Sequence, residues 1–207
     1  MASVALVGEF LTRRPPPKSI TDTNPAKLFI FTSQEPPTTW PNHLRTGTTP
    51  PAEIFFSTLA TTRANAGGLA AQRALEHDAN LELARAAKDA GAKVYVLVSS
   101  TGANAASPVP FLKLKGEIEE SILALGFERT VVFRPGIIAG RREERTLAEA
   151  VVRSVAAGWV SKPWLRDWWS QDAEEIARAA VRAGVRAWKG EGEEGGKKVV
   201  MLHGRHC

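Results

Sequence analysis

The residues best suited to chemistry are two serines and a lysine in the middle of the chain. Ser99 and Ser100 directly follow a short run of apolar and β-branched residues at positions 94–98. Such a run is typical of a strand that is buried on both faces of a parallel sheet. The serines would then lie at the carboxyl end of this strand, the edge at which open α/β sheets bind ligands. Their hydroxyl groups therefore indicate a ligand site.

Lys115 belongs to an amphipathic segment. Between Pro110 and Leu125, apolar residues recur three and four positions apart, at Phe111, Leu114, Ile118, Ile122 and Leu125. This spacing predicts a helix that ends near Gly126. Because Phe111 and Lys115 are four positions apart, they share one face of the helix and can contact the same bound molecule.

A second buried strand is predicted at Thr130–Phe133, where Pro135-Gly136 ends the pattern because proline supplies no donor to the sheet. Strand, helix and strand of this length make one βαβ unit. The middle of the chain is therefore predicted to be α/β.

These residues together resemble a known superfamily. A strand ending in Ser-Ser, an aromatic residue four positions before Lys115, and a strand followed by Pro135-Gly136 resemble the short-chain dehydrogenase/reductases. With the segments 57–63, 66–68 and 115–117, the chain looks like the atypical branch of fungal mitochondrial outer-membrane proteins related to the Tat-interacting protein of animals. The resemblance is specific over 54–145 and weaker to 184. It implies a Rossmann-like, doubly wound parallel sheet.

The resemblance also implies catalytic roles. Ser100, with Ser99 as the alternate, would orient a substrate carbonyl, and Lys115 would bind ribose and lower the pKa of a tyrosine that exchanges the substrate proton. Phe111 occupies the tyrosine position and has no ionisable proton. General acid–base catalysis contributes a factor of about 10² to 10⁴, so carbonyl reduction is expected to be slow. Tyr95, the only tyrosine, is predicted to lie inside a strand.

The implied cofactor is NADP(H). The positions that would contact it are Gly8, Arg13, Arg14, Thr58, Leu59, Ala60, Lys115, Pro135 and Gly136. An arginine at the end of the second strand is how such folds accept the 2′-phosphate of NADP. Arg13 and Arg14 can equally be read as a basic loop before three prolines, and Thr58–Thr61 as a strand cap.

The amino-terminal region departs from the pattern. Residues 3–8 read as the first strand of a nucleotide-binding fold, after which a glycine-rich loop and a helix should cradle the pyrophosphate. The family's Thr-Arg-Arg follows after only three residues, and the next glycine is Gly47. The first βαβ unit is therefore predicted to be truncated and residues 1–53 to be irregular or incomplete. The alternative is one long edge strand over Val4–Thr12.

The remaining segments are assigned more coarsely. Residues 20–51 are predicted to be loop, except for a strand at 27–32. Trp159, Trp164, Trp168 and Trp169 could line a pocket, touch a membrane interface or pack a lid. Other expected elements are a strand at Ile54–Leu59, helices at Leu69–Ala90, Leu147–Ala157 and Gln171–Ala183 with Ser170 as N-cap, a polar spacer at 190–198 and an edge strand at Val199–Leu202.

Length and composition predict a single domain over 1–207, and the resemblance implies that it binds NAD(P). Of its 207 residues, 43% are hydrophobic and 24% charged, which is typical of a globular protein. No run is long enough for a membrane span, the lone Cys207 favours a reducing compartment, and no spacing indicates a metal.

Partners are narrowed by the same evidence. The resemblance implies a nicotinamide nucleotide, a small carbonyl substrate and peripheral membrane contact. A net charge of +5 is modest and scattered, so no nucleic acid is expected. The resemblance implies the cytosolic face of the mitochondrial outer membrane; otherwise the cytoplasm is expected. Three functions remain: an oxidoreductase with impaired hydride transfer, a non-catalytic nucleotide-sensing or protein-binding scaffold and, least favoured by the scattered charge, a binder of membrane surfaces or nucleic acid.

Overall fold

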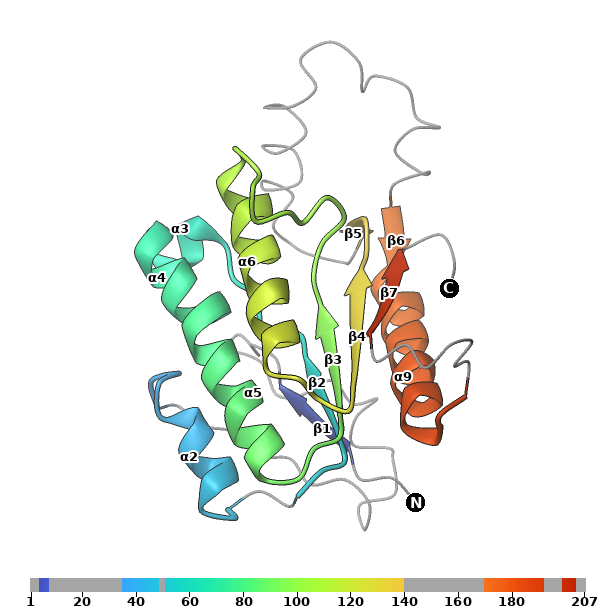
Figure 1. Cartoon of the computed structure of the whole chain (residues 1–207). Coiled ribbons are helices and arrows are strands. Elements are labelled where there is room, and N and C mark those ends of the chain that lie inside the picture. Colours follow the sequence, from blue (N-terminus) through green and yellow to red (C-terminus); the bar gives the residue numbers. More distant parts are fainter. Residues whose placement is uncertain (1–3, 8–34, 49–50, 140–169, 192–198, 204–207) are drawn as a thin grey trace.

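The centre of the molecule is a parallel β-sheet (Figure 1). The computed structural model describes residues 4–7, 35–48, 51–139, 170–191 and 199–203. Five strands pair in the order β1-β2-β3-β4-β7, and all four pairings are parallel. They are β1 (Val4–Val7), β2 (Ile54–Ser57), β3 (Val94–Val98), β4 (Arg129–Arg134) and β7 (Val199–His203). The predicted strands at 54–59, 94–98, 130–133 and 199–202 are confirmed.

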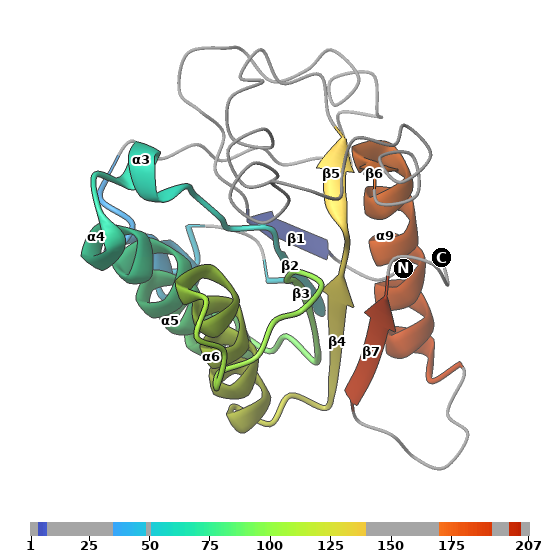
Figure 2. The ribbon, with the colours of Figure 1, turned by 90° about the horizontal axis from the view of Figure 1, so that it is seen from above.

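Helices cover both faces of the sheet, so the doubly wound, Rossmann-like class is confirmed (Figure 2). One face carries α2 (Trp40–Arg45), α5 (Asn80–Asp89) and α6 (Pro110–Ala124), and the other carries α9 (Ala173–Lys189). Alternate side chains of β2 point to opposite faces of the sheet and pack into two different hydrophobic cores. Phe55 packs towards α5 and α6, whereas Ile54 and Phe56 pack towards α9.

Helix α9 lies close to the sheet at one glycine. A Cβ atom on Gly184 would lie 2.7 Å from the Phe56 ring and 2.9 Å from a methyl group of Val96. The missing side chain is therefore what allows the helix to approach the two strands.

The predicted helix at Leu69–Ala90 is confirmed, with one irregular turn. It consists of α4 (Leu69–Arg73), the π-helical segment η1 (Ala74–Ala79) and α5, and it follows the short α3 (Arg63–Ala66). A π-helical turn widens the helix and shifts the direction of the side chains that follow it. Glu76 lies in this turn and is buried.

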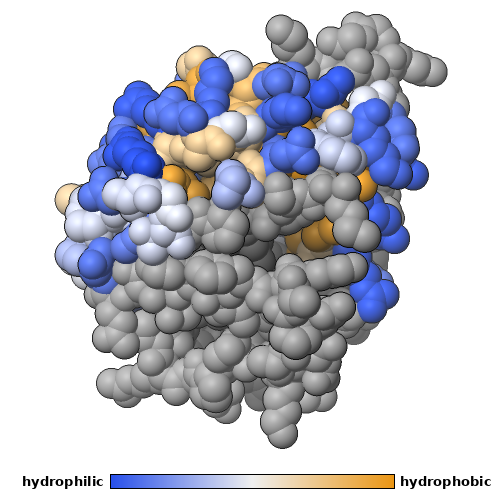
Figure 3. Space-filling view, turned by 90° about the horizontal axis from the view of Figure 1, so that it is seen from below, coloured by the Kyte–Doolittle hydropathy of each residue, from blue (hydrophilic) through white to orange (hydrophobic). Residues whose placement is uncertain are grey.

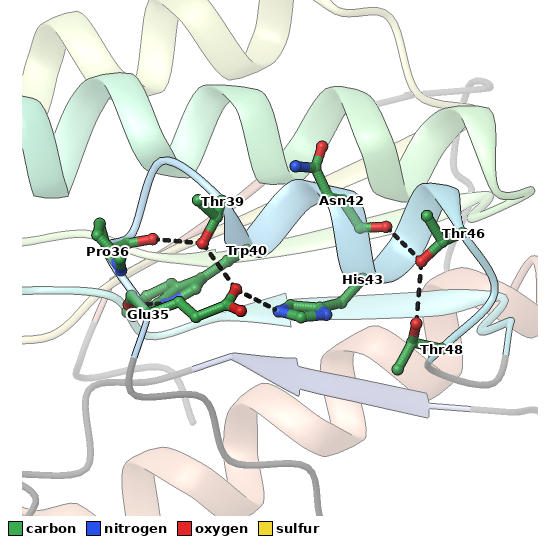
Figure 4. A network of polar contacts seen from close by, with 8 residues as sticks. All are labelled: Glu35, Pro36, Thr39, Trp40, Asn42, His43, Thr46 and Thr48. Atoms are coloured by element: carbon green, nitrogen blue, oxygen red, sulfur yellow. Dashed lines mark hydrogen bonds and ion pairs between the residues drawn. The ribbon is translucent and has the colours of Figure 1, made fainter.

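The loop predicted over residues 20–51 is wrong at α2. Pro41 lies in its first turn, where proline loses no helical hydrogen bond. Glu35 fixes the approach to the helix, since its carboxylate accepts from Thr39 Oγ1 at 3.0 Å and lies 3.2 Å from His43 Nε2 (Figure 4). Trp40 Nε1 donates to the Glu35 carbonyl at 2.9 Å.

The N-cap prediction at Ser170 is also wrong. Ser170–Asp172 forms β6, which pairs in parallel with β5 (Ile137–Ala139), and α9 begins only at Ala173 and continues to Lys189. Backbone pairing with a distant strand therefore takes precedence over the local capping signal. The predicted elements at 27–32 and 147–157, most of the spacer at 190–198 and the four tryptophans lie outside the described residues.

The described helices include none that is long and apolar enough to cross a membrane. Viewed from below, the described surface presents mainly hydrophilic side chains with apolar residues between them (Figure 3).

Candidate functional site

The candidate residues gather where the strands end. Because β2, β3 and β4 are parallel, the segments that follow them meet at one edge of the sheet. Backbone contacts tie two of these segments together: Ser99 N donates to Phe133 O at 2.8 Å, and Thr101 N donates to Pro135 O at 2.9 Å. Residues 58–60, 99–100 and 135–136 therefore share an edge, whereas Gly8, Arg13 and Arg14 lie outside the described residues.

Lys115 is buried and paired with a carboxylate. Its Nζ lies 2.6 Å from Glu76 Oε2, and the side chains are 6% and 0% exposed respectively. The other carboxylate oxygen of Glu76 accepts from Thr61 N at 3.1 Å and from Gln72 Nε2 at 2.9 Å. Gln72 Nε2 also lies 3.2 Å from Thr61 O. One carboxylate thus connects Lys115 to the segment that follows β2.

Phe111 lies beside the Lys115 ammonium. The Nζ atom is 5.8 Å from the centre of the ring, within range of a cation–π interaction. The Phe111 side chain is 45% exposed, although the lysine beside it is buried. The helix therefore brings both residues to one place, as their spacing predicted.

The two serines differ in their surroundings. Ser99 is buried, and its hydroxyl donates to Glu119, whose carboxylate also accepts from Arg134 Nε at 3.0 Å and Nη2 at 2.5 Å. This pairing raises the pKa of the Arg134 guanidinium. Ser100 is half-buried and donates only a long 3.4 Å bond to Thr101 O. The Ser100 hydroxyl is therefore the better placed of the two for a ligand.

Tyr95 lies away from position 111, where the resemblance implies a phenol. It is fully buried in β3, and its hydroxyl donates to Asn80 Oδ1 at 2.8 Å, which also accepts from Ser57 Oγ at 2.7 Å. Burial raises the pKa of the Tyr95 phenol, so this group remains protonated and away from the strand ends.

Gly116 allows the segment after β3 to approach α6 closely. A Cβ atom on this glycine would lie 2.1 Å from Ala105 N and 2.3 Å from Asn104 C. Asn104 N also donates to Leu112 O at 3.0 Å. The segment after β3 therefore rests directly on α6, beside the lysine.

Sequence reasoning missed Glu76, Glu119 and Gly116. The sequence held a signal for Glu76, because Gln72, Glu76 and Asn80 are spaced four positions apart and share a helix face with the apolar Leu83. In the structure all four side chains are buried. Polar residues on the core face of a helix need partners, so they indicate a buried polar network. The described residues hold no cluster of His, Cys, Asp or Glu suited to a metal ion.

Hydroxyl groups and an ammonium at the strand ends suit the ribose half of a dinucleotide. Ser100 and Lys115 can donate to ribose or carbonyl oxygens, and the buried Glu76 keeps a full positive charge acceptable at this depth. The described donor set therefore fits the nicotinamide-ribose half, and the residues expected at the pyrophosphate lie outside it.

Solved structures share this fold, and two of the three described here hold a nicotinamide nucleotide. The UDP-Glc/GlcNAc 4-epimerase of Campylobacter jejuni aligns with a TM-score of 0.62 at 14% identity, over 96% of this chain and 69% of its own. The Bordetella bronchiseptica enzyme WbmG in complex with NAD gives 0.57 at 15% identity, over 96% and 63%. RMD from Pseudomonas aeruginosa complexed with NADPH gives 0.55 at 14% identity, over 81% and 68%. The chain thus has the Rossmann-type fold of NAD(P)-dependent reductases and epimerases.

Curated sequences narrow this class to one family. Protein FMP52, mitochondrial, of Coccidioides immitis is 58% identical over 203 residues, which are 95% of this chain and 82% of the relative. Its counterpart in Aspergillus clavatus is 48% identical over 196 residues, or 94% and 82%. No protein-family model matches the chain. The chain belongs to the family of fungal FMP52 proteins.

Proposed function

We propose that this FMP52-family protein is an NADP(H)-binding member of the atypical short-chain dehydrogenase/reductases whose carbonyl reduction is impaired. The observation that carries the proposal is the pairing of the buried Lys115 with Phe111 at the ligand edge of the sheet. The lysine needed to hold a ribose is present, whereas the neighbouring aromatic ring has no hydroxyl to donate.

Each remaining residue has a proposed task. Lys115 donates to a ribose hydroxyl, and Ser100, rather than Ser99, donates to a carbonyl oxygen of the substrate. The segments 58–60 and 135–136 line the nucleotide, while Gly8 and the Arg13-Arg14 pair are proposed for its phosphates. A reduced nicotinamide supplies a hydride when bound. The proton that must follow has no donor at Phe111, which limits the rate.

The proposal is tested by adding a phenol hydroxyl at position 111. We expect NADPH to quench the fluorescence of the purified chain saturably, and Phe111→Tyr to gain reduction of a panel of small carbonyl compounds by about 10² or more. Phe111→Leu is the matched control, since it changes the ring without adding a hydroxyl. Absence of NADPH binding by both wild type and Phe111→Tyr would refute the cofactor assignment.

A non-catalytic role is the second candidate. The exposed, proton-free Phe111 ring favours a nucleotide sensor or protein-binding scaffold over an efficient enzyme. NADPH binding without activity gained by Phe111→Tyr would support this alternative.

The proposed place of action is the mitochondrial surface. The relatives are named as mitochondrial, and family resemblance suggests peripheral attachment to the cytosolic face of the outer membrane. Protease treatment of intact mitochondria carrying the tagged protein tests this, because a protected tag would contradict the cytosolic face.

A further inference from the structure

We propose that Glu76 is a positioning residue of the nucleotide site, which acts by holding the Lys115 ammonium in its charged form and in place. This inference rests on the proposed function, and it adds a residue outside the Ser, Tyr and Lys positions on which that function was based.

The geometry of the carboxylate carries the inference. Glu76 is fully buried and divides its two oxygens between two different segments of the site. One oxygen lies 2.6 Å from Lys115 Nζ on α6, and the other accepts the Thr61 N–H in the segment after β2. The helix that bears Glu76 therefore fixes these two segments against each other.

The π-helical turn supports a specific role. Glu76 lies within η1, whose wider turn breaks the regular 3.6-residue spacing just before α5 begins at Asn80. Such turns disturb the hydrogen bonding of a helix and occur frequently at functional sites. Gln72, one turn earlier, donates from Nε2 at 2.9 Å to the Glu76 oxygen that also accepts from Thr61 N. The carboxylate is therefore held by a residue of its own helix as well.

Charge explains why Lys115 needs this partner. A buried ammonium without an anion loses its proton more easily, because desolvation disfavours the charged form. Two of the three carboxylates of α6 have their own partners, since Glu119 pairs with Arg134 and Glu117 pairs with Arg73 of α4. The third, Glu120, is exposed. Among the described residues, Glu76 is thus the carboxylate in contact with the Lys115 ammonium.

The decisive variant is Glu76→Gln, which keeps the size of the side chain and removes its charge. We expect its affinity for NADPH at pH 8.5 to fall at least tenfold and to recover towards the wild-type value at pH 6, because lower pH favours the charged form of a buried ammonium that has lost its anion. NADH, measured in parallel, separates this effect from titration of the 2′-phosphate. A purely structural defect would not recover at lower pH.

Glu117→Gln is the matched control. It removes a carboxylate from the same pair of helices, but its partner is the exposed Arg73. This bond lowers the pKa of the Glu117 carboxyl, so the control also removes an ionised group. We expect its affinity to stay within twofold of wild type at each pH.

A double variant decides the matter if Glu76→Gln does not fold. Glu76→Gln/Lys115→Gln removes both charges together, which leaves no buried charge unpaired. If Glu76 acts by holding a charged Lys115 in place, this double variant binds NADPH at least tenfold more weakly than wild type at pH 8.5 and at pH 6 alike, because it has no ammonium left to hold. Affinity within twofold of wild type in the double variant would contradict the proposed role.

The outcomes separate the two proposals. No binding by wild type overturns the proposed function and the role of Glu76 with it. Wild-type binding that Glu76→Gln leaves unchanged or makes tighter overturns the role of Glu76 alone.

Discussion

Ser99 and Ser100 are adjacent in sequence, yet their hydroxyl groups have different surroundings. Ser99 bonds to a buried carboxylate that Arg134 also holds, whereas Ser100 makes only a long bond to its neighbour. We expect Ser99→Ala to lower the free energy of unfolding by about 1.5–3 kcal/mol, the range for a hydrogen bond to a charged group. Urea denaturation measures this change.

Ser100→Ala is the control, with an expected change within about 0.5 kcal/mol because no buried partner is left behind. Equal stability losses in the two variants would show that Ser99 is not a structural residue. Ser99 would then again be a candidate, beside Ser100, for the serine that contacts a ligand.

Residue types predicted part of this site and missed its supports. The common face of Lys115 and Phe111 was predicted from their spacing, because residues four positions apart on a helix lie on one side, whereas their roles came from the family resemblance. The partners Glu76 and Glu119 approach from other turns and other elements, and this depends on tertiary packing. A sequence pattern indicates which face a side chain occupies, but not which distant atom it contacts.

At the scale of elements, the contact between α6 and the segment after β3 is set by Gly116. A methyl group there would collide with backbone atoms of Asn104 and Ala105, which cannot rotate away as side chains can. We expect Gly116→Ala to cost about 3 kcal/mol or more, at or above the usual range for overpacking. Denaturation by urea or heat measures the loss.

Gly184→Ala provides the comparison at α9, where the obstructing atoms belong to the Phe56 and Val96 side chains. These can shift, so we expect a smaller cost of about 1–2 kcal/mol. The exposed substitution Glu120→Ala, on α6 itself, should change stability by less than about 0.5 kcal/mol. A Gly116→Ala variant as stable as Glu120→Ala would contradict the close approach.

Elements buried in the sheet followed from the sequence, whereas those with competing signals did not. The apolar runs of β2, β3 and β4 predict buried strands, because a sheet covered by helices on both faces buries every side chain of such a run. Helix α2 was missed because Pro and Thr around it indicate loop, although Pro41 also suits a first helical turn. β6 was missed because its pairing with β5 joins residues distant in sequence.

At the scale of the whole molecule, stability at high pH reports on the buried Tyr95. A free phenol ionises near pH 10, but burial raises the pKa of Tyr95 in the folded protein. The unfolded chain therefore loses this proton first, so stability is complete below pH 10 and falls above it. The expected slope is up to about 1.4 kcal/mol per pH unit.

Tyr95→Phe should remove that contribution. At pH 7 the variant is expected to be about 1 kcal/mol less stable than wild type, since a buried hydrogen bond is lost, but its stability should decline less between pH 9 and 11. Chemical denaturation across this range measures both effects. Ser57→Ala loses the other bond to Asn80 without losing an ionisable group, so its slope should match the wild type. Identical slopes for all three proteins would contradict the buried phenol.

The Glu76–Lys115 pair also limits how this chain can change over evolutionary time. Either charge alone, left in a buried position, destabilises the fold strongly, whereas an apolar or neutral pair can be tolerated. A lineage that abandons nucleotide binding therefore cannot discard Lys115 by a single substitution at low cost. The two positions are expected to drift together, so that homologues which have lost the lysine should also have lost the acid.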